Sequence, residues 1–199
     1  SKCGLGWMSS ELPSAGISSL YEDYYTHGDD GREIKFEKSS LLVFLTEVLS
    51  ILSKLLGLSH QRTESEHMYL KKKKPGRLLD IGCGDGSKLA LFKELGWTVE
   101  GQETDPLAAN RARAVSGATV HCGDIEGLNF PDKRYDAIIL NHVLEHLLNP
   151  VEVLQICKRT LAPGGVIVVK LPNFSGYGHQ AFGRFWRGLE PPRHLFHYG

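Results

Sequence analysis

The chain has 199 residues, of which 41% are hydrophobic and 23% are charged, so it can bury the core of one domain with a small extension. Lysine plus arginine and aspartate plus glutamate both number 23, and without an excess of cations we expect no nucleic-acid partner. The four cysteines form no CxxC pair, which favours reduced thiols in a cytoplasmic protein, and the N-terminus lacks the pattern of a signal peptide.

Residues 1–74 predict a helical N-terminal extension. The apolar stretch "LLVFLTEVLSILSKLLGL", at 41–58, carries polar residues such as Glu47 on one side at helical spacing. It therefore predicts an amphipathic helix and no membrane partner, because a charge near the middle of a bilayer is costly. A further helix is expected over 61–73, beginning near Thr63, whose side chain can form a capping box with Glu66.

From residue 75 the pattern changes to apolar runs that alternate with amphipathic ones, which predicts a separate domain over 75–199. Five runs predict strands: "RLLDIG", "WTVEGQE", "ATVHCGD", "RYDAIILNH" and "GVIVVKLPN". Helical patterns separate the first three strands and precede the fifth. This order predicts an α/β fold, a doubly wound, Rossmann-like and mostly parallel sheet with flanking helices.

The stretch "DIGCGDGS" places three glycines between the first strand and its helix, at Gly82, Gly84 and Gly86. Such a loop lies at the carboxyl edge of the sheet, where ligands bind, and glycine lets a ligand approach the backbone closely. The spacing is not GxGxxG, and an acid at position 85 would repel a pyrophosphate. The loop therefore predicts a small ligand that carries positive charge.

Two more acids end neighbouring strands. Glu103 is placed to accept hydrogen bonds from the hydroxyls of a ribose, and Asp124 from an exocyclic amine such as that of adenine. Either acid alone is typical of a solvated loop. Together with the glycine loop they predict a nucleoside pocket.

These segments, with "LNHVLEHLLNP" and "LAPGGVIVVKLPN", resemble the successive motifs of class I S-adenosylmethionine-dependent methyltransferases over about half of the chain. The resemblance implies S-adenosylmethionine as cofactor and a small-molecule acceptor. It also implies which residues bind the cofactor. One residue differs from the family pattern, since Gln102 occupies a position that is usually apolar. The implied cofactor-binding residues are Asp80, Gly82, Gly84, Gly86, Glu103, Asp124, Ile125 and Asn141.

Methyl transfer to a hydroxyl is helped by a general base, and histidine is the first candidate. His142 follows the fourth strand, beside the expected position of the methyl group. His194 lies in "LEPPRHLFHY", which together with Trp186 resembles a subgroup acting on sugar and polysaccharide precursors. We therefore name His142 and His194 as catalytic candidates. No metal set is evident, because a carboxylate partner for the histidines cannot be picked from sequence.

Two other functions stay open: an NAD-dependent oxidoreductase, which would need the GxGxxG spacing, and a catalytically inactive cofactor-binding domain. The family ends its sheet with an antiparallel hairpin that these 199 residues do not predict. The fifth strand would then be an exposed edge, which favours association. We expect that edge to be covered by the aromatic residues Phe182, Phe185, Trp186 and Phe196, or by a second copy in a homodimer.

Overall fold

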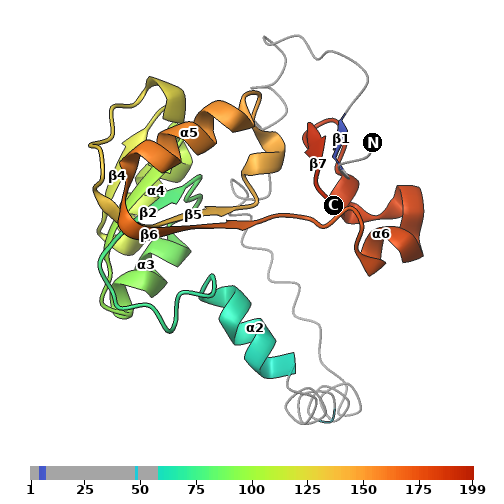
Figure 1. Cartoon of the computed structure of the whole chain (residues 1–199), viewed down its shortest axis with the longest axis horizontal. Helices are drawn as coiled ribbons and strands as arrows, with labels where there is room; N and C mark the ends of the chain where they lie inside the picture. The colour runs from blue at the N-terminus through green and yellow to red at the C-terminus, as the bar shows by residue number, and fades with distance from the viewer. Residues whose placement is uncertain (1–4, 8–47, 49–57) are drawn as a thin grey trace. The chain divides into compact units, whose positions relative to one another are not determined.

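The computed structural model describes residues 5–7, 48 and 58–199 (Figure 1). Two compact units divide these residues, and the chain passes from one to the other between Lys74 and Pro75. One unit contains Pro75–Gly199 with the short strand β1 (Gly6–Trp7), and the other contains helix α2 (Leu58–Glu66). Most of the helix expected over 41–58 lies outside the described residues. Within the described residues, no helix is long and apolar enough to cross a membrane.

Helix α2 differs from the helix expected over 61–73 at both ends. It is already helical at Leu58, the first described residue of this segment, so Thr63 lies inside the helix and cannot form the predicted capping box. It ends at Glu66, because Met68 and Tyr69 adopt positive φ angles of 48° and 56° that a right-handed helix does not allow. Neither residue type signals such a backbone conformation in the sequence.

The second unit contains a five-stranded parallel sheet with the order β4-β3-β2-β5-β6. Its strands are β2 (Arg77–Ile81), β3 (Thr98–Glu103), β4 (Thr119–Cys122), β5 (Tyr135–Asn141) and β6 (Leu161–Lys170). The predicted α/β doubly wound fold is confirmed. Ile81 pairs with Gln102 on one side and Leu140 on the other, so the carboxyl ends of the three central strands lie together.

Helices α3 (Ser87–Glu94) and α5 (Pro150–Thr160) lie on opposite sides of the strands in Figure 1. Helix α4 (Pro106–Ser116) packs against α3, and its N-cap Asp105 accepts hydrogen bonds from the first turn. The strand order reverses between β2, which leads into α3, and β5. A switch of this kind opens a crevice at the carboxyl edge of the sheet.

The remaining short elements are found at the carboxyl edge and in the tail. They are the 3₁₀ turns η3 (Ile125–Gly127) and η4 (Leu144–His146), then α6 (Tyr177–Phe182), η5 (Gly183–Phe185), η6 (Arg187–Leu189) and β7 (Phe196–His197). Strand β7 pairs antiparallel with β1, and Leu195 N donates a hydrogen bond to the carbonyl of Glu145 at 2.8 Å. The tail is thereby joined to η4.

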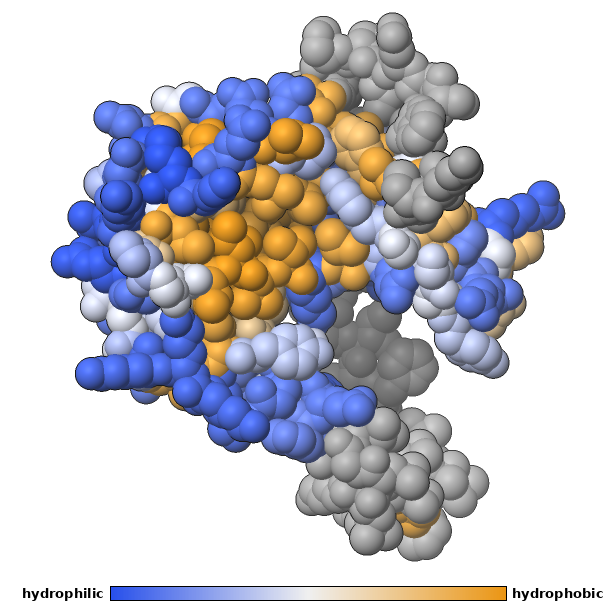
Figure 2. Space-filling view, viewed as in Figure 1, coloured by the Kyte–Doolittle hydropathy of each residue, from blue (hydrophilic) through white to orange (hydrophobic). Residues whose placement is uncertain are grey.

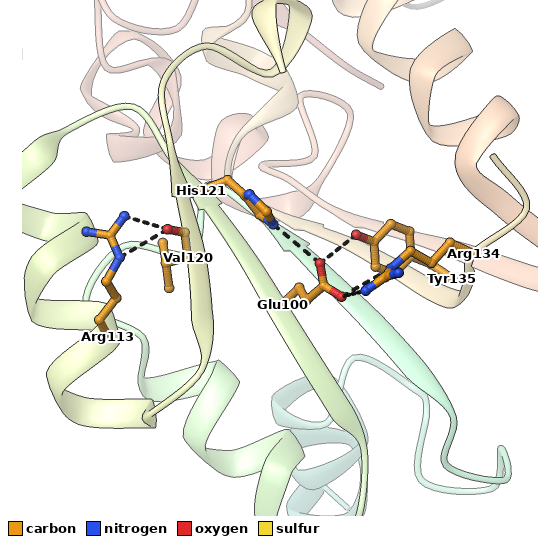
Figure 3. Close-up of polar contacts among 6 residues, drawn as sticks. All are labelled: Glu100, Arg113, Val120, His121, Arg134 and Tyr135. Carbon is orange, nitrogen blue, oxygen red and sulfur yellow. Dashed lines mark hydrogen bonds and ion pairs between the residues drawn. The ribbon is translucent and has the colours of Figure 1, made fainter. Parts of the chain in front are cut away.

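Glu100, on β3, is the centre of a polar network that crosses the sheet (Figure 3). Its carboxylate accepts hydrogen bonds from Arg134, from the hydroxyl of the buried Tyr135 at 2.9 Å and from His121 at 3.3 Å. Burial alone would raise the pKa of Glu100, but these three donors outweigh it and the pKa is lowered. The network satisfies a buried phenol and lies away from the glycine loop, so its role is structural.

Among the described residues, β6 pairs only with β5, and no antiparallel hairpin follows it. Figure 2 shows an apolar area over β6 and the segments beside it. Val169, in β6, is 37% exposed. The aromatic tail does not cover this edge as expected. Phe182 and Phe185 are 63% and 78% exposed, Phe196 lies in β7, and the ring of Trp186 packs on His179.

Candidate functional site

The glycine loop joins β2 to α3, and its three glycines serve different purposes. Gly86 has φ of 81°, and a Cβ there would lie 2.6 Å from the backbone of Ala112, so this glycine permits close packing of α4. At Gly82 a Cβ would meet Val143 at 2.5 Å. Gly84 has no atom within 4 Å of the position of a Cβ. Open space at Gly84 is therefore the place where a ligand can approach the backbone.

Gln102 and Glu103, at the end of β3, hold this loop. The buried side chain of Gln102 accepts a hydrogen bond from Gly82 N at 3.2 Å and donates one to the carbonyl of Gly123 at 2.7 Å. Glu103 accepts a hydrogen bond from Gly84 N at 2.8 Å. The departure at Gln102 noted in the sequence thus has a structural reason, because an apolar side chain could not join the loop to the end of β4.

Glu103 is half-buried. Its other carboxylate oxygen, Oε1, accepts hydrogen bonds from Thr104 N at 2.8 Å and Asp105 N at 3.2 Å. These backbone donors hold the carboxylate beside the open space at Gly84. The hydroxyl of Thr104 donates to the same oxygen, Oε1, at 3.3 Å, whereas Oε2 accepts the hydrogen bond from Gly84 N and keeps a lone pair for a ligand hydroxyl. Glu103 therefore lies at the carboxyl edge of the sheet beside Gly84, and the ribose role assigned to it from sequence stays a prediction.

Asp80 lies on β2 just before the loop, and only 2% of it is exposed. Burial raises the pKa of Asp80 to about 8, Lys88 lowers it in part, and the neighbouring charge of Glu103 raises it further. A buried acid of this kind becomes ionised when a cation approaches. Asp80 and Glu103 together form an acidic edge beside Gly84, which suits a ligand that carries positive charge.

Asp124 and Ile125 follow β4 at the same edge. Asp124 is exposed, so its carboxylate is open to a ligand. Ile125 is different: its side chain is buried in the core cluster with Ile81 and Leu140. Any contact between Ile125 and an adenine would therefore use the backbone of this residue.

Asn141 ends β5 and His142 follows it, and the next residue, Val143, lies against Gly82 of the glycine loop. Asn141 Oδ1 is buried and has no hydrogen-bond partner among the described residues, so it suits a ligand donor. His142 has φ of 58°, an unusual conformation for a non-glycine residue, and is fixed by a hydrogen bond from its N to the carbonyl of Lys170 at 2.8 Å. Its side chain is 49% exposed, and Nδ1 lies 3.3 Å from Glu145 Oε1.

Glu145 lies in η4, is 1% exposed, and contacts the ring of His142 through Oε1. A ring that donates its Nδ1 proton to this carboxylate keeps the lone pair on Nε2. The pair has the geometry of a base with its orienting acid, an arrangement that the sequence did not reveal. The sequence predicts His142 as a candidate base, but no pattern in "NHVLEH" distinguishes Glu145 from a solvated acid.

His194, the second catalytic candidate, is 3% exposed. Its Nδ1 lies 2.8 Å from the carbonyl oxygen of Gly188, and its Nε2 lies 3.2 Å from Glu190 Oε2. His194 packs against His146, with ring centroids 4.7 Å apart. Burial lowers the pKa of His146. The structure places His194 behind η4, and the exposed ring of His142 is the better placed of the two to meet an acceptor.

A surface hollow of about 540 Å³ lies at the opposite edge of the sheet. Its lining includes Lys133, before β5, and Leu161, at the start of β6. These positions belong to the amino ends of the strands, away from the glycine loop. None of the site residues assigned from the sequence lines this hollow.

A family model described as a methyltransferase domain matches residues 58–199, which is most of the chain. The chain belongs to this family. The methyltransferase domain is 30% identical over 115 residues to a "probable S-adenosylmethionine-dependent methyltransferase" of Mycolicibacterium smegmatis, covering 57% of this chain and 45% of the relative. It is 36% identical over 104 residues to a ubiquinone biosynthesis O-methyltransferase of Bradyrhizobium sp., covering 49% of this chain and 40% of the relative.

The chain thus spans less than half the length of these two curated relatives. Two solved structures share its fold. The PH0226 protein of Pyrococcus horikoshii has a TM-score of 0.52 at 24% identity, with 66% of this chain and 60% of that chain covered. BH2331 of Bacillus halodurans has a TM-score of 0.55 at 19% identity, with 67% and 62% covered. The methyltransferase domain is of the class I, S-adenosylmethionine-dependent type.

Replacing Glu103 with alanine should raise the dissociation constant for S-adenosylmethionine about ten- to a hundredfold, because the change removes an acceptor for the ribose hydroxyls and the tie to Gly84 N. Isothermal titration calorimetry measures the change. Glu126→Ala, an exposed acid in η3, is the matched control and should bind as the wild type does. An unchanged dissociation constant for Glu103→Ala would rule out this role.

Proposed function

We propose that this methyltransferase domain transfers the methyl group of S-adenosylmethionine to a hydroxyl of a small-molecule acceptor. The observation that carries the proposal is the His142–Glu145 pair at the end of β5, beside the glycine loop. A half-exposed imidazole oriented by a buried carboxylate is suited to remove a proton from a hydroxyl. The name of the Bradyrhizobium relative also describes an O-methyltransferase.

The residues of the loop fit the cofactor. Open space at Gly84 admits a ligand, Asn141 Oδ1 lacks a donor among the described residues, and Asp80 is a buried acid that a cation would ionise. In the proposed arrangement Asp80 faces the ammonium group, Glu103 the ribose hydroxyls and Asp124 the adenine amine. The cofactor supplies an activated methyl group on a sulfonium.

The chain's own residues then orient and deprotonate the acceptor. His142 Nε2 accepts the proton of the hydroxyl while Nδ1–H stays directed at Glu145 Oε1. The deprotonated oxygen would be held in line with the methyl group that the bound cofactor supplies, and His142 would keep the proton until it is lost to water. The protein's main contribution is alignment of the reacting atoms in line.

A sugar or polysaccharide precursor is the acceptor class that we propose within this function. Its support is the resemblance of the segment around Trp186 and "LEPPRHLFHY" to a sugar-related subgroup. A homodimer through the exposed edge of β6 and a cytoplasmic location likewise stay predictions.

Turnover on a panel of acceptors tests the proposal. The chain would be incubated with S-adenosylmethionine labelled in the methyl group, and transfer to sugar nucleotides, catechols, amines and carboxylic acids would be followed by mass spectrometry. We expect methylated oxygen in at least one hydroxyl acceptor. Transfer only to nitrogen or carboxylate would contradict the hydroxyl acceptor. Cofactor binding with no transfer to any of them would favour the inactive cofactor-binding domain.

A further inference from the structure

Three side chains that the cofactor does not need converge between η4 and the tail: Glu145, His146 and His194. Each offers one atom that could bind a metal, and the three atoms lie within 4.8 Å of one another. The two segments are held by the backbone, since Leu195 N donates to the carbonyl of Glu145 at 2.8 Å. The group is therefore part of the packed structure, and it brings together residues from distant parts of the sequence.

Hydrogen bonds fix the tautomer of both histidines. His146 Nδ1 lies 3.1 Å from the carbonyl oxygen of Arg193, and His194 Nδ1 lies 2.8 Å from that of Gly188. A carbonyl oxygen only accepts, so each Nδ1 carries a proton and each neutral ring has its lone pair on Nε2. Histidines that bind metals commonly donate their other ring N–H to a backbone carbonyl in this way.

Two carboxylates, those of Glu145 and Glu190, lie close to the two histidine rings. Glu145 Oε2 is buried and has no hydrogen-bond partner among the described residues, while Oε1 faces His142. A buried acceptor without a donor is costly, and a cation would satisfy it. Glu190 Oε2 also lies 3.2 Å from His194 Nε2, where two acceptors meet if the ring is neutral. A cation removes this conflict, and Glu190 is placed to become a further ligand.

We propose that Glu145, His146 and His194 bind a divalent transition-metal ion, with Zn²⁺ as the best match. Two imidazoles and one carboxylate are ligands that Zn²⁺ takes, and they leave a position for water or Glu190. The ion would hold the tail against η4, and Glu145 would still orient His142 through Oε1. This differs from the sequence-based expectation of no metal set, because the carboxylate that completes the group is recognised only in the fold.

Titration of the untagged, chelator-treated 199-residue chain with Co²⁺ and then Zn²⁺ tests the proposal without any turnover assay. We expect one ion per chain, a visible d–d absorption band of Co²⁺ and its displacement by Zn²⁺. The absence of a thiolate charge-transfer band would separate this site from the exposed Cys122. Glu145→Gln and His194→Gln should each raise the dissociation constant about tenfold or more.

His179→Gln is the matched control. Its Nδ1 also lies near a backbone carbonyl, that of Phe174 at 2.9 Å, but it is outside the group and its replacement should leave metal binding unchanged. If Glu145→Gln does not fold by circular dichroism, His194→Gln decides. No stoichiometric binding by the wild type would overturn the proposal. Equal binding by wild type and His194→Gln would overturn it as well.

Discussion

Replacing His142 with asparagine should lower turnover on a hydroxyl acceptor by about a hundred- to ten-thousandfold, the usual contribution of a positioned base. Asparagine tolerates the positive φ of 58° at this position better than most residues, so the backbone should be kept while the base is lost. The cofactor's dissociation constant should not change, because His142 follows the pocket residues and faces the acceptor. Steady-state kinetics and calorimetry on the same preparation measure both quantities.

Glu145→Gln extends this test, because it keeps the shape of the side chain and removes the charge that orients the ring. We expect a smaller loss of turnover than in His142→Asn. His179→Asn, in α6 and stacked on Phe174, is the control that should keep full turnover. Full turnover by His142→Asn on an acceptor that is a true substrate would show that His142 is not the base.

Replacing Asp80 with asparagine should weaken cofactor binding and stabilise the chain in the absence of cofactor. Burial raises the pKa of Asp80 to about 8, well above that of an unfolded aspartate. The folded state therefore holds a proton that the unfolded state loses, and the free energy of unfolding falls as pH rises from about 4 to about 8. Asparagine has no proton to lose, so this part of the pH dependence should disappear.

Urea unfolding at pH 6 and pH 8.5 without cofactor measures the effect. Between these values the wild type should lose roughly 1–3 kcal/mol more than Asp80→Asn, since one pKa unit corresponds to about 1.4 kcal/mol. Asp136→Asn, in β5, is a control that leaves the buried acid in place, and asparagine can still accept the hydrogen bond that Asp136 Oδ2 receives from Arg77 N. Equal pH dependence in the wild type and Asp80→Asn would show that Asp80 is ionised at neutral pH in the folded chain.

The parallel sheet was predictable because its signals are local. Apolar runs such as "AIIL" end in Asn141, glycines mark the loop after β2, and Asp105 caps α4, so each element carries its own pattern. Glu103 and Asp124 could be assigned to the site because parallel strands bring their carboxyl ends to one edge. Their place at that edge follows from position along the chain, and their contacts with a cofactor stay predictions.

The parts that could not be predicted depend on contacts between distant segments. In the sequence Gln102 is only a polar residue in an apolar strand. Its purpose is seen in the fold, where its side chain forms hydrogen bonds with Gly82 and Gly123. In the sequence Glu145 is indistinguishable from an ordinary acid, because His194, which lies beside it in the fold, is distant along the chain. The packing of the aromatic tail depends in the same way on the folded chain.

Calorimetric titration of the purified chain with S-adenosylmethionine, and separately with NAD, tests the central claim most directly. We expect one site per chain for S-adenosylmethionine, weakened by Glu103→Ala and by Asp80→Asn, and no heat of binding with NAD. Binding of NAD in preference to S-adenosylmethionine, or binding of S-adenosylmethionine that neither variant weakens, would contradict the site described for this methyltransferase domain.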